Sequence, residues 1–408
     1  MRVKALVVVL LLLVSGCSAP FLGDTTTDAE TEVLNESTVD ATTTDAPMTE
    51  TTTTTDTLGG DEYDVTVQNG TLGVDEDEAY GRTQSLLGTD IEPRPVEVRN
   101  LTEHRGFAPG ANDFFATMGV GNASFAEDTA GGLTTTSGAV YIHPGNGSPG
   151  EVEQVLVHEY VHAAQFNGNM LPWIDALEQP RLTNDLVQTR LSLVEGGAVY
   201  VSDVYTDQHL DVAPSSTRIA DEYDSGSTAE RLFLARYHFG NQYVANEIDD
   251  PSELETVYED YPRTTEQLLH PGSDDAERDL NVAVDDAGEW RTAGNDTIGE
   301  LTTRVLLSGE LDDDTASQAV AGWGTDDVVI LRNDDQRAYI WAFRMDDTSE
   351  ADELAAAMET FADARNADSD AMFAVDRPTG ETVVLTAAPD SFDAAVEGEN
   401  GSVTVTVE

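Results

Sequence analysis

The alternation of apolar and polar positions predicts a helix from residue 149 to residue 167. Its apolar face consists of Val152, Val155, Leu156 and Ala163. Residues 148–151 read Ser-Pro-Gly-Glu, which is the order of a capping box with a proline in the first turn, and Gly168 supplies a stop signal. The capping residues and the apolar stripe together predict a helix that is held inside a domain.

A second amphipathic stretch begins near Asp185 and runs on towards Tyr205. Upstream of both helices, the pattern predicts one further helix, two short alternating runs, a loop and a strand. These elements are residues 75–87, 65–67, 96–98, 129–133 and 138–143. The alternating runs do not reveal the order of the strands in a sheet. The mixture of helices and short strands predicts an α+β fold.

The polar and charged residues 272–294 indicate a boundary between two regions. Beyond it we expect two helices, a strand pair, a long helix with Ser349 at its N-cap, and a second strand pair. These elements are residues 298–307, 315–321, 327–331, 338–343, 349–364, 373–375 and 382–385. The order predicts a small ββαββ sheet with one covered face. Region 273–408 would then pack on the part before it.

The charge of the chain narrows the classes of partner. The 408 residues include 78 acidic and 20 basic side chains, for a formal net charge of −58. Such a surface repels nucleic acid, so we expect no nucleic-acid partner. At low ionic strength, repulsion among these carboxylates would destabilise a compact fold. Molar salt shortens the Debye length to about 3 Å and screens this repulsion, so the charge indicates a protein that works in concentrated brine. A wholly disordered acidic chain is excluded, because apolar residues recur in patterned segments throughout.

The N-terminus predicts export. Arg2 and Lys4 precede an apolar run at residues 5–14, which is too short to span a bilayer and favours a signal peptide. The run leads to Leu-Val-Ser-Gly-Cys, which resembles a lipoprotein signal and implies cleavage before Cys17 and a lipid on its sulfur. The alternative is simple secretion with Cys17 incidental. With a lipid, the protein would lie on the extracellular face of the cell membrane.

Residues 1–16 are therefore expected to be removed, and residues 17–61 to form a disordered tether. The tether is rich in Thr, Asp and Glu and has almost no large apolar residue. Cys17 is the only cysteine, which excludes an intramolecular disulfide and a cysteine-rich zinc site. In an exported protein, the Asn-x-Ser/Thr sequons are candidate glycan sites. They lie at Asn35, Asn69, Asn100, Asn122, Asn146, Asn295 and Asn400.

The helix at 149–167 contains the pattern His-Glu-x-x-His. His158 and His162 are four residues apart, so they lie on one face of the helix and can share one Zn²⁺ ion. Glu159 can reach a water bound to the metal and act as a general base. The pattern can also arise by chance on an amphipathic helix. The capped, largely apolar helix, the export signal and a third ligand further along the chain favour a genuine metal site.

Glu195 is the candidate third ligand. It occurs in the otherwise apolar middle of the second helix, where an isolated charge is costly and a divalent cation would be a suitable partner. Gly196 and Gly197 would let this helix approach the first one closely. The alternative is a carboxylate on the helix surface. Three protein ligands would leave a fourth position for water, as in catalytic zinc sites.

His158-Glu159-Tyr160-Val161-His162, followed by Leu193-Val194-Glu195-Gly196-Gly197, resembles the gluzincin group of zinc metallopeptidases. It is similar to surface lipoproteins of haloarchaea within that group. The resemblance implies a zincin-like domain at 62–272, with a mixed sheet, an active-site helix and a glutamate helix. It assigns zinc binding to the histidines and Glu195, and base catalysis to Glu159. It also implies that the strand at 138–143 is a sheet edge that pairs with substrate.

The same resemblance covers the segments that could supply a donor to the developing oxyanion. The candidates are Tyr237, His238, Tyr243 and His270. Tyr237 and His270 are the two that we take as catalytic, although core packing is an alternative for each. Asp203 is a candidate partner for a ligand histidine. His143 is expected to be a strand-end residue and no ligand.

We therefore expect a lipid-anchored zinc metallopeptidase, acting as a monomer on a peptide or protein substrate. The alternative from another class is a surface lipoprotein that keeps the fold, and with it the zinc, for a binding or structural role. The presence of Glu159 favours the enzyme, because a metal store has no need of a base beside its first ligand. A zinc hydrolase with a non-peptide substrate shares the same ligands.

Overall fold

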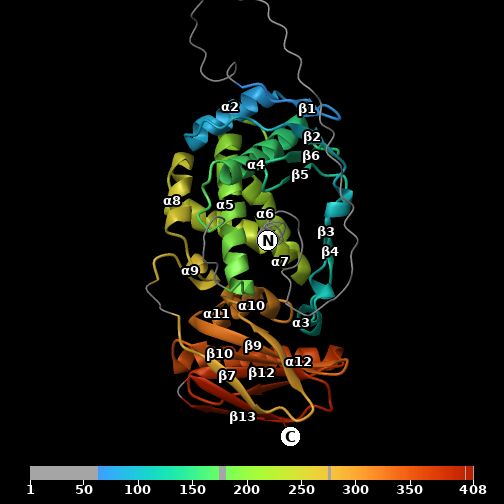
Figure 1. Ribbon diagram of the computed structural model, residues 1–408, viewed down its shortest axis with the longest axis vertical. Helices are drawn as coiled ribbons and strands as arrows, with labels where there is room; N and C mark the ends of the chain where they lie inside the picture. The colour runs from blue at the N-terminus through green and yellow to red at the C-terminus, as the bar shows by residue number, and fades with distance from the viewer. Residues whose placement is uncertain (1–62, 174–180, 274–276, 400, 408) are drawn as a thin grey trace, which may run out of the picture.

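The computed structural model describes residues 63–173, 181–273, 277–399 and 401–407. The predicted signal peptide, Cys17 and the tether lie outside these residues. The described chain has mixed α and β structure, as expected, with a helix-rich part at one end and a sheet-rich part at the other (Figure 1). Among the described residues, no helix combines the length and apolar character needed to cross a membrane.

Four short strands form the sheet of the first part. They are β1 (Val67–Gln68), β2 (Val96–Val98), β5 (Gly131–Thr134) and β6 (Val140–His143). The order is β1-β2-β6-β5, with the first three strands parallel and β5 antiparallel to β6. Residues 129–133 were predicted to be a loop, which is wrong for Gly131–Leu133. The predicted edge strand, β6, is an inner strand, and β5 forms the edge.

Three helices confirm the predictions from periodicity, namely α2 (Glu76–Leu87), α4 (Pro149–Asn167) and α5 (Asn184–His209). The capping box at the start of α4 is present. Ser148 N donates to Glu151 Oε2 over 2.7 Å, and Ser148 Oγ accepts from Glu151 N over 3.4 Å. Val152, Leu156 and other apolar residues of α4 are buried against β6 and α2. The sheet therefore holds α4 in place by hydrophobic burial.

The glycine pair of α5 serves a purpose different from the predicted one. A Cβ on Gly196 would overlap the backbone of Gly240, which lies in α7 (Thr228–Glu247). A Cβ on Gly197 would overlap the hydroxyl of Tyr258. The close backbone approach of α5 is therefore to α7 and not to α4, although Gly197 also leaves room for a side chain of α4.

The remaining elements of the first part are short or lie around this helical centre. They are η1 (Thr102–His104), β3 (Gly106–Phe107), η2 (Pro109–Ala111), α3 (Asp113–Thr117), β4 (Ala123–Ser124), α6 (Ser215–Ser225), η3 (Pro251–Glu253), α8 (Leu254–Glu259) and α9 (Thr265–Leu269). Strands β3 and β4 pair with each other, and they lie on the same side of the molecule as β5 (Figure 1).

The second part contains the predicted ββαββ order together with four further strands, β7, β8, β13 and β14. Its helices and strands are β7 (Asn281–Asp286), β8 (Arg291–Asp296), α10 (Glu300–Leu307), α11 (Asp313–Val320), β9 (Trp323–Asn333), β10 (Gln336–Met345), α12 (Thr348–Asp368), β11 (Met372–Asp376), β12 (Thr382–Ala388), β13 (Ala394–Glu399) and β14 (Ser402–Val407). The N-cap of α12 is Asp347, which accepts from Ser349 N over 2.7 Å, so the predicted cap at Ser349 is wrong.

Two sheets are stacked in this second part. The five-stranded sheet has the order β11-β12-β10-β9-β8, and α12 covers one of its faces. A three-stranded sheet of order β13-β14-β7 covers the other face, where Val403 and Val405 pack against Ile340 and Val384. The prediction of a single covered face is therefore wrong. Strands β7, β13 and β14 supply the second cover.

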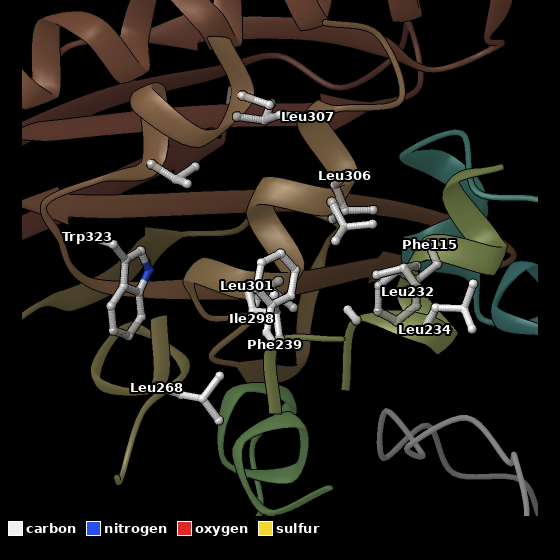
Figure 2. Close-up of a cluster of buried hydrophobic side chains, with 14 of the residues drawn as sticks. Phe115, Leu232, Leu234, Phe239, Leu268, Ile298, Leu301, Leu306, Leu307 and Trp323 are labelled. Carbon is white, nitrogen blue, oxygen red and sulfur yellow. The ribbon is translucent and has the colours of Figure 1, made fainter. Parts of the chain in front are cut away.

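An apolar core joins the two parts. Figure 2 shows Phe239 and Leu268 of the first part beside Ile298, Leu301 and Trp323 of the second. All five side chains are buried and belong to one continuous cluster. The second part thus packs on the first, as the order of elements indicates. The predicted boundary falls at 272/273, just before residues that lie outside the structural description.

Buried carboxylates accompany this core. Asp326 accepts hydrogen bonds from Ile298 N and Gly299 N, both over 2.8 Å, and from the indole of Trp323 over 2.9 Å. Asp185, in the first turn of α5, accepts from Thr265 N over 2.9 Å. Burial raises the pKa of Asp185 to about 7 and that of Asp326 to about 6. In the folded protein these carboxyls therefore ionise well above their usual pH.

The Asp185→Asn variant is expected to gain stability relative to wild type as the pH rises. The folded pKa of Asp185 is raised, so its contribution is favourable below about pH 4 and is lost as the pH passes about 7. Asparagine removes the cost of ionisation. In molar salt, the melting temperature of the variant should rise by several degrees relative to wild type between pH 5 and pH 8. An exposed control, Asp363→Asn, should show no such trend, and a pH-independent difference for Asp185→Asn would contradict the assignment.

Candidate metal centre

Three side chains converge between α4 and α5, as the spacing predicts. His158 Nε2 and His162 Nε2 are 3.1 Å apart. Oε2 of Glu195 lies 3.2 Å from His162 Nε2 and 3.5 Å from His158 Nε2. Three ligands at about 2.0–2.1 Å from a tetrahedral zinc ion would stand about 3.3 Å apart. The three atoms therefore have the spacing of three corners of such a tetrahedron.

The hydrogen bonds of Gln165 determine which nitrogen of His162 faces the centre. The side-chain nitrogen of Gln165 donates to Val194 O over 2.9 Å and to Tyr258 Oη over 2.7 Å. Its oxygen is therefore left to accept from His162 Nδ1, 2.7 Å away. In the neutral ring, Nε2 then carries a lone pair that faces Glu195 Oε2. Two acceptors at this distance need a cation between them, and a metal ion fits.

The pKa shifts of His162 and Glu195 are consistent with a cation between the two side chains. Burial disfavours the imidazolium form of His162, but the carboxylate of Glu195 outweighs burial and raises the pKa of His162 to about 9. Burial likewise opposes ionisation of Glu195, and the two histidines reverse that effect and lower its pKa. Without a metal, a proton on His162 Nε2 supplies the positive charge between this nitrogen and the Glu195 carboxylate. A divalent cation would displace that proton and satisfy all three ligands.

One side of the triad is more open than the rest. The side chain of His158 is 17% exposed, whereas that of His162 is 6% exposed. The ring of Phe166 stacks on that of His162 with centroids 6.2 Å apart, which covers one face of the His162 ring. A fourth ligand or a substrate would thus approach from the side of His158.

Glu159 lies between the triad and the edge strand. Its side chain is buried, and Thr134 Oγ1 on β5 donates to Glu159 Oε2 over 2.6 Å. A Cβ on Gly132, in the same strand, would overlap the Glu159 side chain. Burial raises the pKa of Glu159, although both ligand histidines and Thr134 act in the opposite direction. A raised pKa makes the carboxylate a better proton acceptor near neutral pH.

Tyr237 is also at the centre. It lies on α7, its ring centroid is 6.3 Å from that of His158, and the Glu195 carboxylate acts on its phenol. Burial, together with the nearby carboxylates, raises the pKa of Tyr237. The phenol therefore stays protonated and can donate a hydrogen bond. Of the four oxyanion candidates, Tyr237 is the one that contacts the metal-binding group.

The other candidates have different partners. His270 follows α9, and its Nε2 lies 2.9 Å from Glu300 Oε1 at the start of α10, so its partner belongs to the junction with the second part. The structure thus does not bring His270 to the metal-binding group, and its predicted catalytic role is not supported. His238, one residue after Tyr237, points elsewhere on α7 and stacks on Tyr223 with centroids 5.0 Å apart. Tyr243 is part of the apolar core.

Asp203 and His143 also differ from ligand partners. Asp203 accepts from Ser215 N over 2.6 Å and from Ser216 N over 3.1 Å, so it caps the first turn of α6. The prediction that it supports a ligand histidine is wrong, because Gln165 has that position. His143 ends β6, and its Nε2 lies 3.1 Å from Glu127 O. It is a strand-end residue, as predicted.

Three residues at the centre were not predicted. Gln165 orients His162, and its place three residues further along the same helix face could have indicated this. Thr134 and Gly132 contact Glu159 from β5, and no local pattern points to them. Both residues belong to β5, and the glycine-rich sequence of this strand predicts a loop instead.

Comparison with known proteins adds one finding. Residues 287–405 match a family model described as a domain of unknown function (DUF8575). The match begins just before β8 and ends in β14, so it contains none of the candidate metal ligands. Curated proteins gave no match, and neither did solved structures.

Proposed function

We propose that the protein is a zinc-dependent metallopeptidase with a zincin-like first part. The observation that carries this proposal is the placement of a buried general base beside a preformed triad of zinc ligands. His158 Nε2, His162 Nε2 and Glu195 Oε2 have tetrahedral spacing, and Glu159 lies between them and the sheet edge. A store for zinc has no use for this fourth group.

The order of the elements supports the zincin-like reading. The helix with both histidines packs under a mixed sheet, a second long helix supplies the glutamate, and an antiparallel strand forms the edge nearest the base. The mixed sheet and the two helices are what the resemblance to gluzincins implies, although the edge strand is β5 instead of β6. The second part, which carries the family match, holds the start of α5 and contributes no ligand.

Zinc held by the triad would supply a Lewis acid for the peptide carbonyl and an acidified water. The carboxylate of Glu159 accepts a proton from the attacking water as the water oxygen bonds to the carbonyl carbon, and it delivers that proton to the amine nitrogen as the C–N bond breaks. The phenol of Tyr237 donates a hydrogen bond to the carbonyl oxygen as negative charge develops there. Thr134 holds the Glu159 carboxylate in place through both steps.

Strand β5 suits an extended peptide. Among the described residues it has one strand neighbour, β6, so its other side presents backbone groups that a peptide can pair with. Because Gly132 and Thr134 of β5 contact Glu159, a paired substrate would lie within reach of the base. The predicted lipid on Cys17 and the tether would place this activity on the extracellular face of the membrane.

The direct test measures bound zinc and cleavage of a mixed peptide library by the purified protein in molar salt. We expect about one zinc ion per chain, cleavage that a chelator stops, and recovery when zinc is returned. Zinc without cleavage would favour a binding lipoprotein that keeps the fold. Cleavage that survives complete removal of metal would refute the proposal.

The Gly132→Ala variant is expected to lower kcat about a hundredfold. The added methyl group would push the Glu159 side chain away from β5, and misplacement of a catalytic group by about 1 Å costs about that factor. The side chain of Glu159 can shift, so the protein should still fold and bind zinc. Gly121→Ala is the matched control, because its methyl group would meet open space. A kcat for Gly132→Ala equal to that of Gly121→Ala would contradict the role of Gly132.

A further inference from the structure

Arg105 lies against the strand that borders the metal centre. Its Nη2 donates to Thr129 O over 2.8 Å, and its Nη1 donates to Thr129 Oγ1 over 3.3 Å. A Cβ on Gly131 would overlap the Arg105 guanidinium. Gly131 is therefore the residue of β5 on which Arg105 rests, and its lack of a side chain makes this contact possible.

The guanidinium is close to the proposed chemistry along the strand. Gly131 contacts Arg105, and the next residue, Gly132, contacts Glu159. Successive residues of a strand face opposite sides and are about 3.3 Å apart along it. Arg105 and Glu159 thus flank β5 on opposite faces, one residue apart. A peptide paired with the free edge of β5 would present alternate side chains to these two faces.

A second set of contacts connects the backbone of Arg105 with Tyr237 at the candidate metal centre. Its carbonyl oxygen accepts from Phe125 N over 2.9 Å. The ring of Phe125 lies 4.7 Å from that of Phe233, whose ring is 5.5 Å from that of Tyr237. The backbone at Arg105 is therefore connected through packed rings to the proposed oxyanion donor, and the guanidinium has a defined place.

The charge around Arg105 is unusual for this chain. Acidic side chains outnumber basic ones by 78 to 20. Within the described part of the chain, however, no carboxylate forms an ion pair with Arg105. Burial lowers the pKa of Arg105, and the charge of Arg218 on α6 lowers it further. Arg218 itself is exposed and pairs with Glu222.

Arg105 also retains hydrogen-bonding capacity. A guanidinium has five N–H donors, and the bonds to Thr129 use two of them. The remaining donors can bind a carboxylate, which is the anion that a peptide carries.

We propose that Arg105 forms a substrate subsite that binds a carboxylate of the peptide within a residue or two of the scissile bond. This inference rests on the proposed peptidase function. The carboxylate is either an Asp or Glu side chain or the free C-terminus of the peptide. The enzyme thus prefers acidic peptides, and it binds them best in salt that screens the net negative charge of the protein.

The test compares matched peptides on a protein that binds but does not cleave. Short peptides carry one Glu, or one Gln in its place, at each position in turn, and each has a free or an amidated C-terminus. Their affinities for the Glu159→Gln variant are measured by calorimetry in molar salt. We expect one Glu position, or the free C-terminus, to bind about ten- to a hundredfold tighter than its neutral match. The arm that shows the preference identifies the source of the carboxylate.

Substitutions then assign the preference to Arg105. In the same background, Arg105→Gln should abolish the preference while neutral peptides bind as before, and Arg105→Lys should keep part of it. The control is Arg99→Gln, directly after β2 of the same sheet, because Arg99 already pairs with Glu97. If Arg105 had only a structural role, Arg105→Gln would lower the affinity for acidic and neutral peptides equally. Selectivity in kcat/KM of the otherwise wild-type enzyme should follow the same order.

Two failures are distinguishable. If peptides are bound and cleaved without any preference for a carboxylate, or if the preference survives Arg105→Gln, the subsite is refuted and the peptidase function stands. If no peptide is bound or cleaved, the peptidase function is refuted, and the subsite with it.

Discussion

Replacing Glu159 by glutamine is expected to lower peptide cleavage about a thousandfold or more while zinc stays bound. Glutamine has nearly the same shape and can still accept from Thr134 Oγ1. It cannot accept the proton of water, and general base catalysis alone contributes up to about 10⁴-fold. The measurement is kcat in molar salt, together with the zinc content of the purified variant.

The matched control is Glu153→Gln on the same helix. Glu153 lies about one and a half turns before His158 and accepts from Tyr205 Oη over 2.6 Å, and glutamine keeps that acceptor. Its kcat should match that of wild type. Equal cleavage by wild type and Glu159→Gln would remove the proposed mechanism, whatever the zinc content.

The second large effect is expected for His162→Ala, which should lower the affinity for zinc by more than about a hundredfold. Loss of a residue that only orients a ligand costs about 10–100-fold, and loss of the ligand itself should cost more. The variant also leaves the buried carboxylate of Glu195 without its nearest partner, 3.2 Å away. The metal-free protein should therefore lose up to about 3 kcal/mol of unfolding free energy.

The control for this substitution is His143→Ala, because His143 is the histidine at the end of the neighbouring strand β6 and contacts Glu127 O. It should bind zinc as wild type does. Affinity is read from competition with a chromophoric chelator, and stability from thermal unfolding of the metal-free proteins. Undiminished zinc affinity in His162→Ala would place the metal elsewhere.

The convergence of His158, His162 and Glu195 could be predicted because the signal for each residue is local. The spacing of His158 and His162 follows from the helical repeat, and the Ser148 capping box fixes where that helix starts. Glu195 stands out because it is an acid in an apolar stretch. The partners from β5 were not readable, because Gly131 and Gly132 lack the β-branched side chains that indicate a strand.

Non-local pairing explains most of the remaining differences. Strand β7 pairs in parallel with β14, about 120 residues further along the chain, and no short-range pattern encodes that contact. For the same reason the second cover of the five-stranded sheet was not predicted. Tyr237 lies at the candidate metal centre and His270 does not, because the packing of α7 and α9 determines where each side chain points.

The junction between the two parts has a practical consequence for shortened chains. Asn184 N donates to Asp296 Oδ1 and Asp185 N to Thr297 O, so the first turn of α5 is held by residues from beyond the boundary. A polypeptide truncated at residue 272 would lose these acceptors and expose Phe239 and Leu268 to water. Since Glu195 lies on the same helix, about 15 Å further on, truncation is expected to disturb the metal ligand as well as solubility.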